Sequence, residues 1–434
     1  MSRPQAPRGT RDLLPAERAA FLRLEGIARG LTDRYGFLPI ETPLFEQAEV
    51  FERGVGAVTD VVEKELFRVS AGRGDSERER WALRPEPTAG MVRAYIQHGM
   101  QTLPQPVKLT LIGPMFRYDR PQAGRYRQFW QFDVEAFGDP GPAVDAEIIE
   151  LALRFYAEAG LPAVELRLNS IGDPLCRPAY IETLRAYLAP HAASLPELEQ
   201  ARLVTSPLRL LDSKEPAMQA LIAGAPSIAD YLCDACAEHF AGVRAHLDAM
   251  GVAYRLEPRL VRGLDYYTRT TFEFFPAGQD GQQDALGGGG RYDGLIELLG
   301  GRATPGIGFG LGLDRVILAL AAAGVAAPDA GHISTVVVGA DPADTVTRLR
   351  IATELRAAGL SARAELGQRK LGKQLESAGR DGAHFAVICG DELDAGQVQL
   401  RDLQAGTQRL VSLAELTREL ARSEAQHRHG AGGR

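Results

Sequence analysis

The residue types between positions 260 and 270 could do more chemistry than any other short stretch of the chain. This segment reads Leu-Val-Arg-Gly-Leu-Asp-Tyr-Tyr-Thr-Arg-Thr, so it combines an arginine, an aspartate, a glycine and two adjacent tyrosines. Shortly downstream, residues 287–294 read Gly-Gly-Gly-Gly-Arg-Tyr-Asp-Gly. Together they supply a fixed cation, a carboxylate, aromatic walls and a backbone bare enough for a ligand to approach closely. The two segments predict a pocket that holds a charged small molecule against a phosphate.

A second group of polar side chains lies in a predicted hairpin, where two runs with strand character (108–117 and 128–137) flank a polar loop. Four arginines gather there: Arg117, Arg120, Arg125 and Arg127. Period-two alternation puts Gln131, Asp133 and Glu135 on one face of the second run, opposite apolar side chains. Clustered arginines repel one another unless they face anions. The spacing leaves two interpretations open, an anion site or an ordinary solvated sheet face.

A proline-rich turn, residues 84–90, precedes a predicted helix at 91–98 and reads Arg-Pro-Glu-Pro-Thr-Ala-Gly. Thr88 is of a type that caps a helix N-terminus, which would be a purely structural role. Alternatively, Glu86 and Thr88 are short-range hydrogen-bonding groups in a turn stiffened by two prolines, which suits a substrate ammonium.

The glycines at 306, 308, 310 and 312 do not predict a dinucleotide site. Their spacing is G-x-G-x-G, and the acidic residue about twenty positions on, Asp329, falls in a predicted linker rather than at a strand end. We expect them to let a strand and a helix pack tightly beneath a ligand, with Arg315 at the helix start. Residues 287–290 lack the Gly-Lys-Ser/Thr of a P-loop, which excludes that scheme.

The spacing Cys233-x-x-Cys236-x-x-His239, with Cys176 in the same region, resembles part of a zinc site. A further ligand is available only if Cys176 folds close. Small buried residues on a helix explain the same pattern, and we predict no metal there.

Length and composition bound the class of protein. The 434 residues suffice for two or three domains, and 45% hydrophobic with 24% charged residues is ordinary for a soluble protein. No apolar run of about eighteen residues predicts a membrane helix, and the first residues do not read as a secretory signal. Four scattered cysteines do not make a disulfide framework, so we expect a cytoplasmic protein. The net charge of −7 argues against nonspecific nucleic-acid binding, but local arginines permit specific RNA recognition.

The elements that must position these groups follow from periodicity. Helices are expected at 16–35 and 142–160, and strands at 108–117, 128–137, 164–169, 253–258 and 270–275, which favour an antiparallel sheet. After the linker, alternating strands and helices from 333 to 389 predict a βαβ domain with a largely parallel sheet. The predicted boundaries are 1–171 and 251–322 for the two parts of the main domain, 172–250 for a helical insertion, 323–331 for the linker, 332–422 for the βαβ domain and 423–434 for a disordered tail.

Taken together, these segments resemble a class II aminoacyl-tRNA synthetase, and specifically the histidyl-tRNA synthetase family. Residues 36–46, 116–135 and 308–315 resemble the three class motifs, the first of which is associated with the dimer interface. Residues 260–270 and 288–294 resemble the two signature blocks of the histidine enzymes. The resemblance implies an α+β catalytic domain with an antiparallel sheet, a helical insertion and a C-terminal α/β anticodon-binding domain.

The resemblance also implies roles at the phosphates. ATP would be bound by Arg117, Arg125 and Arg315, with Arg117 at the α-phosphate. Arg262 stands where other enzymes of the class place a metal, opposite Arg117. These two arginines would be catalytic, because they stabilise the charge that builds as the amino-acid carboxylate attacks phosphorus.

For the amino acid and the tRNA, the resemblance implies further residues. Histidine would be surrounded by Glu86, Pro87, Thr88, Gln131, Glu135, Arg262, Tyr266 and Tyr267. Pro87 departs from the glycine common in the family and should stiffen its turn. The hairpin tip, Arg120 and Gln122 especially, would reach the acceptor end of the tRNA. The implied substrates and partners are L-histidine, ATP with Mg²⁺, tRNA(His) and a second copy of the chain in a homodimer.

The same resemblance admits a second function, a synthetase-like, histidine-sensing regulatory subunit of ATP phosphoribosyltransferase. Such subunits usually lack the anticodon domain and have lost the arginines. Here Arg117, Arg262 and Arg315 are all present and the domain after residue 331 is complete. The residues therefore favour the enzyme, histidine–tRNA ligase.

Overall fold

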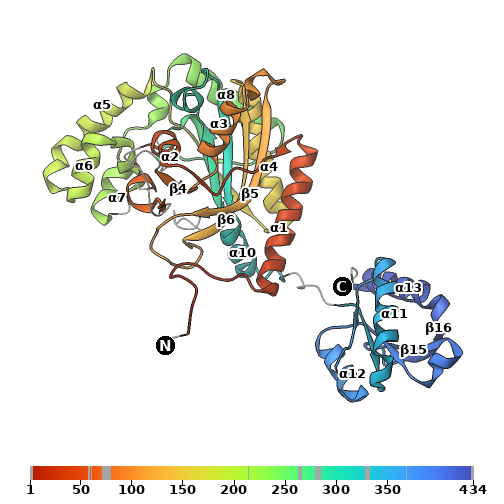
Figure 1. Cartoon of the computed structure of the whole chain (residues 1–434). Helices are drawn as coiled ribbons and strands as arrows, with labels where there is room; N and C mark the ends of the chain where they lie inside the picture. The colour runs from red at the N-terminus through yellow and green to blue at the C-terminus, as the bar shows by residue number, and fades with distance from the viewer. Residues whose placement is uncertain are drawn as a thin grey trace. The chain divides into compact units, whose positions relative to one another are not determined.

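The computed structural model describes residues 3–56, 59, 61–70, 80–213, 215–261, 266–278, 285–327, 333–367 and 369–431. The chain forms two compact units, Met1–Pro328 and Asp329–Arg434 (Figure 1). Among the described residues, no helix combines the length and the apolar composition that crossing a membrane requires.

The first unit is built on an eight-stranded sheet. Its order is β1 (Leu38–Pro39), β5 (Val107–Phe116), β6 (Gln128–Phe137), β11 (Gly306–Gly312), β10 (Gly287–Arg291), β9 (Thr268–Pro276), β7 (Val164–Ser170) and β8 (Arg255–Leu256). All pairings from β5 through to β7 are antiparallel, and only the two edge strands pair in parallel. The predicted antiparallel sheet is confirmed.

Strand β10 was not predicted. Four of the five residues of β10 are glycines, which carry no side chain whose alternation could reveal a strand. The same bareness lets its neighbours approach, because a Cβ on Gly289 would lie 2.0 Å from the carbonyl oxygen of Gly308.

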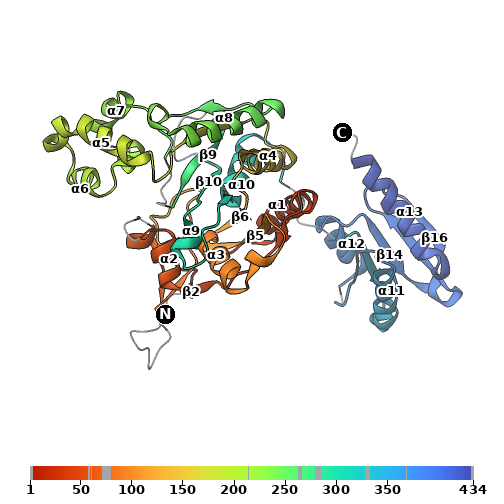
Figure 2. The same cartoon turned by 90° about the horizontal axis from the view of Figure 1, so that it is seen from above.

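Helices cover both faces of the sheet. One face carries α1 (Pro15–Arg34), α4 (Pro142–Ala159), α8 (Asp234–Ala249) and α10 (Leu313–Ala322). The other faces α2 (Ala48–Gly54), α3 (Thr88–Gln97) and α9 (Leu295–Leu298), which Figure 2 shows across the strands from α4 and α8. A small sheet in the order β2 (Phe45–Gln47), β4 (Trp81–Leu83) and β3 (Arg68–Val69) leads into α3.

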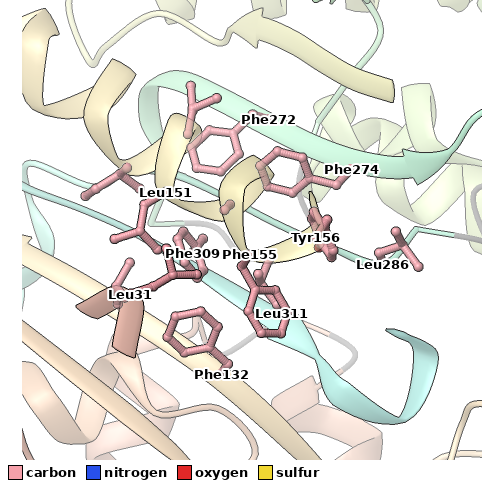
Figure 3. Packing of buried hydrophobic residues seen from close by; sticks show 14 of the residues in the cluster. Leu31, Phe132, Leu151, Phe155, Tyr156, Phe272, Phe274, Leu286, Phe309 and Leu311 are labelled. Carbon is pink, nitrogen blue, oxygen red and sulfur yellow. The ribbon is translucent and has the colours of Figure 1, made fainter. Parts of the chain in front are cut away.

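The main core lies on the α4 side of the sheet. Alternate residues of the strands, including Phe132, Phe272 and Phe309, pack there against α4 (Figure 3). Phe132 lies between Phe155 and Phe309, with ring centroids 5.0 and 5.3 Å away. Since neighbouring residues of a strand point to opposite faces, this core directs Gln131, Asp133 and Glu135 toward α3.

The predicted helical insertion contains α5 (Arg177–Leu188), α6 (Glu197–Thr205) and α7 (Pro216–Ala223), joined by 3₁₀ turns at Ala189–Ser194, Pro207–Asp212 and Ile228–Tyr231. The last helix of that range, α8, buries Phe240, Val243 and Leu247 in the main core. The insertion therefore ends in a helix that is an integral part of the sheet packing.

The second unit contains a five-stranded sheet in the order β13 (Ala362–Ala364), β12 (Thr335–Gly339), β14 (Phe385–Cys389), β15 (Gln397–Asp402) and β16 (Gln408–Ser412). Its first three strands are parallel and connected through α11 (Thr345–Ala357) and α12 (Leu371–Arg380), as the βαβ prediction requires. The last two strands run antiparallel.

The segment predicted as a disordered tail, from residue 423, overlaps a helix in the structure. Helix α13 (Leu413–Ala431) continues through that segment. Leu416 and Leu420 are buried on one side of the helix, and Glu424 one turn further accepts a hydrogen bond from Ser334.

Candidate active site

The centre of the candidate site is the polar row on β6, which we call the acid row and define as Gln131, Asp133 and Glu135. Asp133 and Glu135 are only 2% and 1% exposed. The interpretation of this face as an ordinary solvated surface is therefore wrong. Burying carboxyl groups is costly unless they find partners, so the surroundings of the acid row indicate what it binds.

The proline-rich turn supplies the first partners. The carboxylate of Glu86 accepts hydrogen bonds from the backbone amides of Thr88 and Ala89, both at 2.9 Å, and so caps the start of α3. The hydroxyl of Thr88 instead donates to Glu135 Oε1 at 2.6 Å. Thr88 is thus not the cap that its residue type allowed. It joins α3 to the acid row, with Pro87 at the preceding position.

Three tyrosines form the next wall. The hydroxyl of Tyr292 donates to Glu135 Oε2, so both oxygens of that carboxyl have a hydroxyl donor. The ring of Tyr266 lies 4.7 Å from Tyr267 and 5.6 Å from Tyr292 between centroids. Tyr292 was not predicted as a site residue, although it lies within the segment 287–294, which was predicted to line a ligand pocket.

The electrostatics of this pocket favour a cation. Burial raises the pKa of Glu86 and lifts the pKa of Glu135 to about 8. Burial, reinforced by Glu135 and Glu86, also raises the pKa of Asp133 well above its ordinary range. Ionising all three neighbouring carboxyl groups in a buried pocket is energetically unfavourable, because each charge loses hydration and repels the others. A positively charged ligand would stabilise the ionised carboxylates.

Two acceptors of the acid row have no donor. Asp133 Oδ2 and Gln131 Oε1 are buried and lack a hydrogen-bond partner among the described residues. Buried acceptors in folded proteins are normally paired, so unpaired ones call for a ligand or a water. An ammonium group, with three donors and one positive charge, fits them.

Glycines of β11 keep the pocket open. A Cβ on Gly308 would lie 1.8 Å from Glu135 Oε2, and one on Gly310 would lie 2.6 Å from Asp133 Oδ1. Opposite Glu135 and Asp133, the register therefore requires residues without a side chain. This is the tight packing beneath a ligand that the glycine spacing predicted.

Two arginines border the carboxyls. Arg84 is buried and donates to Pro114, Thr42 and Glu41, while its Nη2 has no partner in the described part of the chain. Arg117 donates from Nε to the carbonyl of Pro85 at 2.8 Å, and its charge opposes the rise that burial causes in the pKa values of Glu86 and Asp133. The pocket therefore places a cation beside a carboxyl cluster, as an amino-acid zwitterion requires.

The chain is similar to known proteins over almost its whole length. The family model described as histidyl-tRNA synthetase matches residues 9–316, and the model described as anticodon binding domain matches residues 335–423. A histidine–tRNA ligase of Desulforudis audaxviator is 49% identical over 418 residues, which cover 96% of this chain and 98% of the relative. Another, of Moorella thermoacetica, is 48% identical over 409 residues, covering 94% and 96%. The chain belongs to the histidyl-tRNA synthetase family.

A solved structure agrees with this assignment. Apo histidyl-tRNA synthetase of S. aureus superposes with a TM-score of 0.80 at 34% identity, covering 96% of this chain and 99% of that one. The class II catalytic fold with its antiparallel sheet and the C-terminal anticodon-binding domain, both predicted, are thus confirmed.

The β5–β6 hairpin contains residues 116–135, which resemble the second motif of class II synthetases. At its tip Arg120 and Gln122 are exposed, while Arg125 is held by Asp119 at 3.2 Å. The ring of Tyr118 lies 3.7 Å from the guanidinium carbon of Arg127. The tip is therefore a fixed turn that presents two polar side chains to solvent.

Two predicted residues remain, Arg315 and Arg262. Arg315, in the first turn of α10, donates to the carbonyl of Ala285 at 2.5 Å, and a Cβ on Gly124 would lie 3.6 Å from its Cγ. The hairpin tip and the start of α10 thus lie together. Arg262, with the Gly263–Asp265 stretch of its signature block, lies outside the described residues.

Proposed function

We propose that this chain is a histidine–tRNA ligase that activates L-histidine with ATP and transfers it to the 3′ end of tRNA(His). The observation that carries this proposal is the buried acid row with two unpaired acceptors beside Arg117. Family membership supports the reaction class, since the relatives matched over nearly their whole length are named histidine–tRNA ligases. We assign the reaction to the cytoplasm.

Histidine has two groups that can carry positive charge or form hydrogen bonds, its α-ammonium and its imidazole. We assign its α-ammonium to the unpaired acceptors Asp133 Oδ2 and Gln131 Oε1, with Glu86 and Thr88 lining the turn beside them. Its imidazole goes to Glu135 with Tyr266 and Tyr267, since an imidazole can both donate and accept at its two nitrogens. A site that pairs both nitrogens rejects isosteres that lack them.

In the first step a carboxylate oxygen of histidine attacks the α-phosphorus of Mg²⁺–ATP. The new O–P bond gives histidyl-adenylate, and the bond to the β-phosphate breaks to release pyrophosphate. Arg117 and Arg262 would stabilise the charge on the α-phosphate from opposite sides, while Arg125 and Arg315 hold the rest of the nucleotide. In the second step a terminal ribose hydroxyl attacks the acyl carbon and AMP leaves.

The tRNA would be held in three places. Arg120 and Gln122 at the exposed hairpin tip would meet the acceptor end, the helical insertion would clasp the acceptor arm, and the second unit would read the anticodon. A homodimer through residues 36–46 completes this proposal.

The regulatory subunit of ATP phosphoribosyltransferase is the alternative. It is disfavoured because Arg117 and Arg315 are retained and residues 335–423 match the anticodon-binding model. A histidine sensor would need the acid row but neither of these features.

The test is histidine-dependent exchange of pyrophosphate into ATP with the purified chain. We expect exchange that requires histidine and no other amino acid. Histidine binding without any exchange would support the sensor, and exchange driven equally by another amino acid would refute the specificity assignment.

A second test concerns Arg262. Arg262→Ala should slow exchange by about 100- to 1000-fold, the usual effect of removing one charge-stabilising group, while histidine binding weakens far less. Equal losses in rate and binding would instead assign Arg262 to ground-state binding.

A further inference from the structure

Four potential metal ligands meet outside the acid row, at the base of the insertion. The side chains of Asp173, Cys176, Cys233 and Cys236 place one ligand atom each within 4.8 Å of all the others. Cys176 therefore does fold close to the Cys-x-x-Cys pair, which the sequence left undecided. His239 is not part of the group, because its imidazole faces Asp145 instead, at 3.7 Å.

The separations between these ligand atoms agree with a tetrahedral metal centre. The Sγ atoms of Cys176 and Cys236 are 3.8 Å apart, and Cys176 Sγ lies 3.5 Å from Asp173 Oδ1. Zinc bonds of about 2.3 Å to sulfur and about 2.0 Å to oxygen at tetrahedral angles imply S···S and S···O separations of about 3.8 and 3.5 Å. A disulfide would need its sulfur atoms about 2.05 Å apart. The separation of 3.8 Å between the two Sγ atoms therefore fits two ligands of one metal ion and not a disulfide.

The backbone around the group is shaped for anionic sulfur. Both pairs have the spacing ligand-x-x-ligand, Asp173 with Cys176 and Cys233 with Cys236. The amide of Asp173 donates to Cys176 Sγ at 3.4 Å. Gly172 turns the chain with φ of +63°, where a Cβ would lie 2.7 Å from Cys176 Sγ.

The cluster joins the two ends of the helical insertion. Cys176 precedes α5 directly, and Cys233 precedes α8. Beside it, Arg269 of β9 contacts Asp173 Oδ2 at 3.7 Å, and Arg177 donates to the carbonyl of Tyr267 at 2.7 Å. A metal bound by these four side chains would hold the two ends of the insertion together. It would also hold them next to the start of β9.

We propose that Asp173, Cys176, Cys233 and Cys236 form a structural zinc site that fastens the base of the insertion to the catalytic sheet. Four protein ligands leave no open coordination position, which is the mark of a structural rather than a catalytic zinc. Thiolates select zinc over magnesium, so this site is distinct from the Mg²⁺ that accompanies ATP.

Metal analysis of the full-length chain, purified without chelator from zinc-supplemented cells, tests the site. We expect about one zinc per chain. Cys236→Ala should lose the zinc, whereas Cys389→Ala should keep it, because Cys389 is an equally buried cysteine of the other unit. Wild-type zinc no higher than in Cys236→Ala, or equal loss in Cys389→Ala, would overturn the proposal.

Asp173→Cys guards against a variant that merely misfolds. It should retain the metal, and after exchange with Co²⁺ its thiolate-to-cobalt absorption should exceed that of the wild type by about one-third, since three thiolates become four. Absence of tetrahedral cobalt absorption in the wild type would refute the site, and so would a Cys176–Cys236 disulfide in the freshly purified protein.

Discussion

At the scale of single residues, the site depends on how a buried carboxyl is kept in place. Glu135 receives one hydroxyl from Thr88 and another from Tyr292, and neither donor is its neighbour in sequence. These contacts orient the carboxyl, which its pKa of about 8 keeps largely protonated near neutral pH in the unliganded chain. A cationic ligand in the pocket would favour its ionised form.

Tyr292→Phe tests this arrangement because it removes one hydroxyl and keeps the ring. A hydrogen bond to a charged group contributes about 1.5–3 kcal/mol, so the KM for histidine in pyrophosphate exchange should rise about 10- to 100-fold. The KM for ATP should stay within about twofold. Tyr180→Phe is the matched control, since that hydroxyl bonds to Pro226 in the insertion. An unchanged KM for histidine would exclude Tyr292 from the site.

The raised pKa of Glu135 predicts how stability depends on pH. In the folded chain this carboxyl titrates at about 8, against an ordinary 4.5, so the folded state holds a proton that the unfolded state has lost. Its contribution to stability is full below pH 4.5 and disappears as pH rises through 8. Urea unfolding between pH 5 and 9 should therefore show a steeper fall in the wild type than in Glu135→Gln. Parallel curves would contradict the shifted pKa.

At the scale of elements, strand β11 decides whether the acid row has room. Gly308→Ala puts a methyl group 1.8 Å from Glu135 Oε2, and the pairing with β6 leaves the backbone no freedom to retreat. We expect a loss of about 1–3 kcal/mol in the free energy of unfolding and a raised KM for histidine. Gly26→Ala, in an open position of α1, should instead stabilise by about 0.5–1 kcal/mol and leave exchange unchanged. Similar outcomes for both variants would refute the clearance argument.

Which elements could be predicted follows from where the information lies. Strands β5 and β6 could be predicted from the sequence because one face of each strand is more buried than the other. Apolar and polar residues therefore alternate along them with a period of two. The burial of the acid row could not be read in the same way. It depends on Thr88 and Tyr292, which are 47 and 157 positions from Glu135 and meet it only through the sheet order.

At the scale of the whole molecule, the two units have separate hydrophobic cores. The clusters of buried hydrophobic residues that pack around the eight-stranded sheet belong to the first unit. The clusters around β12 and β14 belong to the second unit. No cluster of buried hydrophobic residues in the described ranges includes members of both. Each unit therefore has the core it needs to fold by itself.

This separation predicts the behaviour of a chain that ends at Ala327. Histidine-dependent pyrophosphate exchange should remain within about threefold of the full chain, because the whole acid row and its partners are retained. Aminoacylation of tRNA(His), measured as kcat/KM, should fall at least about 100-fold, equivalent to about 3 kcal/mol of lost recognition. Arg120→Ala in the full chain offers a comparison, since it alters an exposed side chain of the first unit and should also spare exchange while weakening transfer. If the shortened chain charges tRNA as well as the full one, the second unit has no part in recognition; if it loses exchange as well, activation depends on both units.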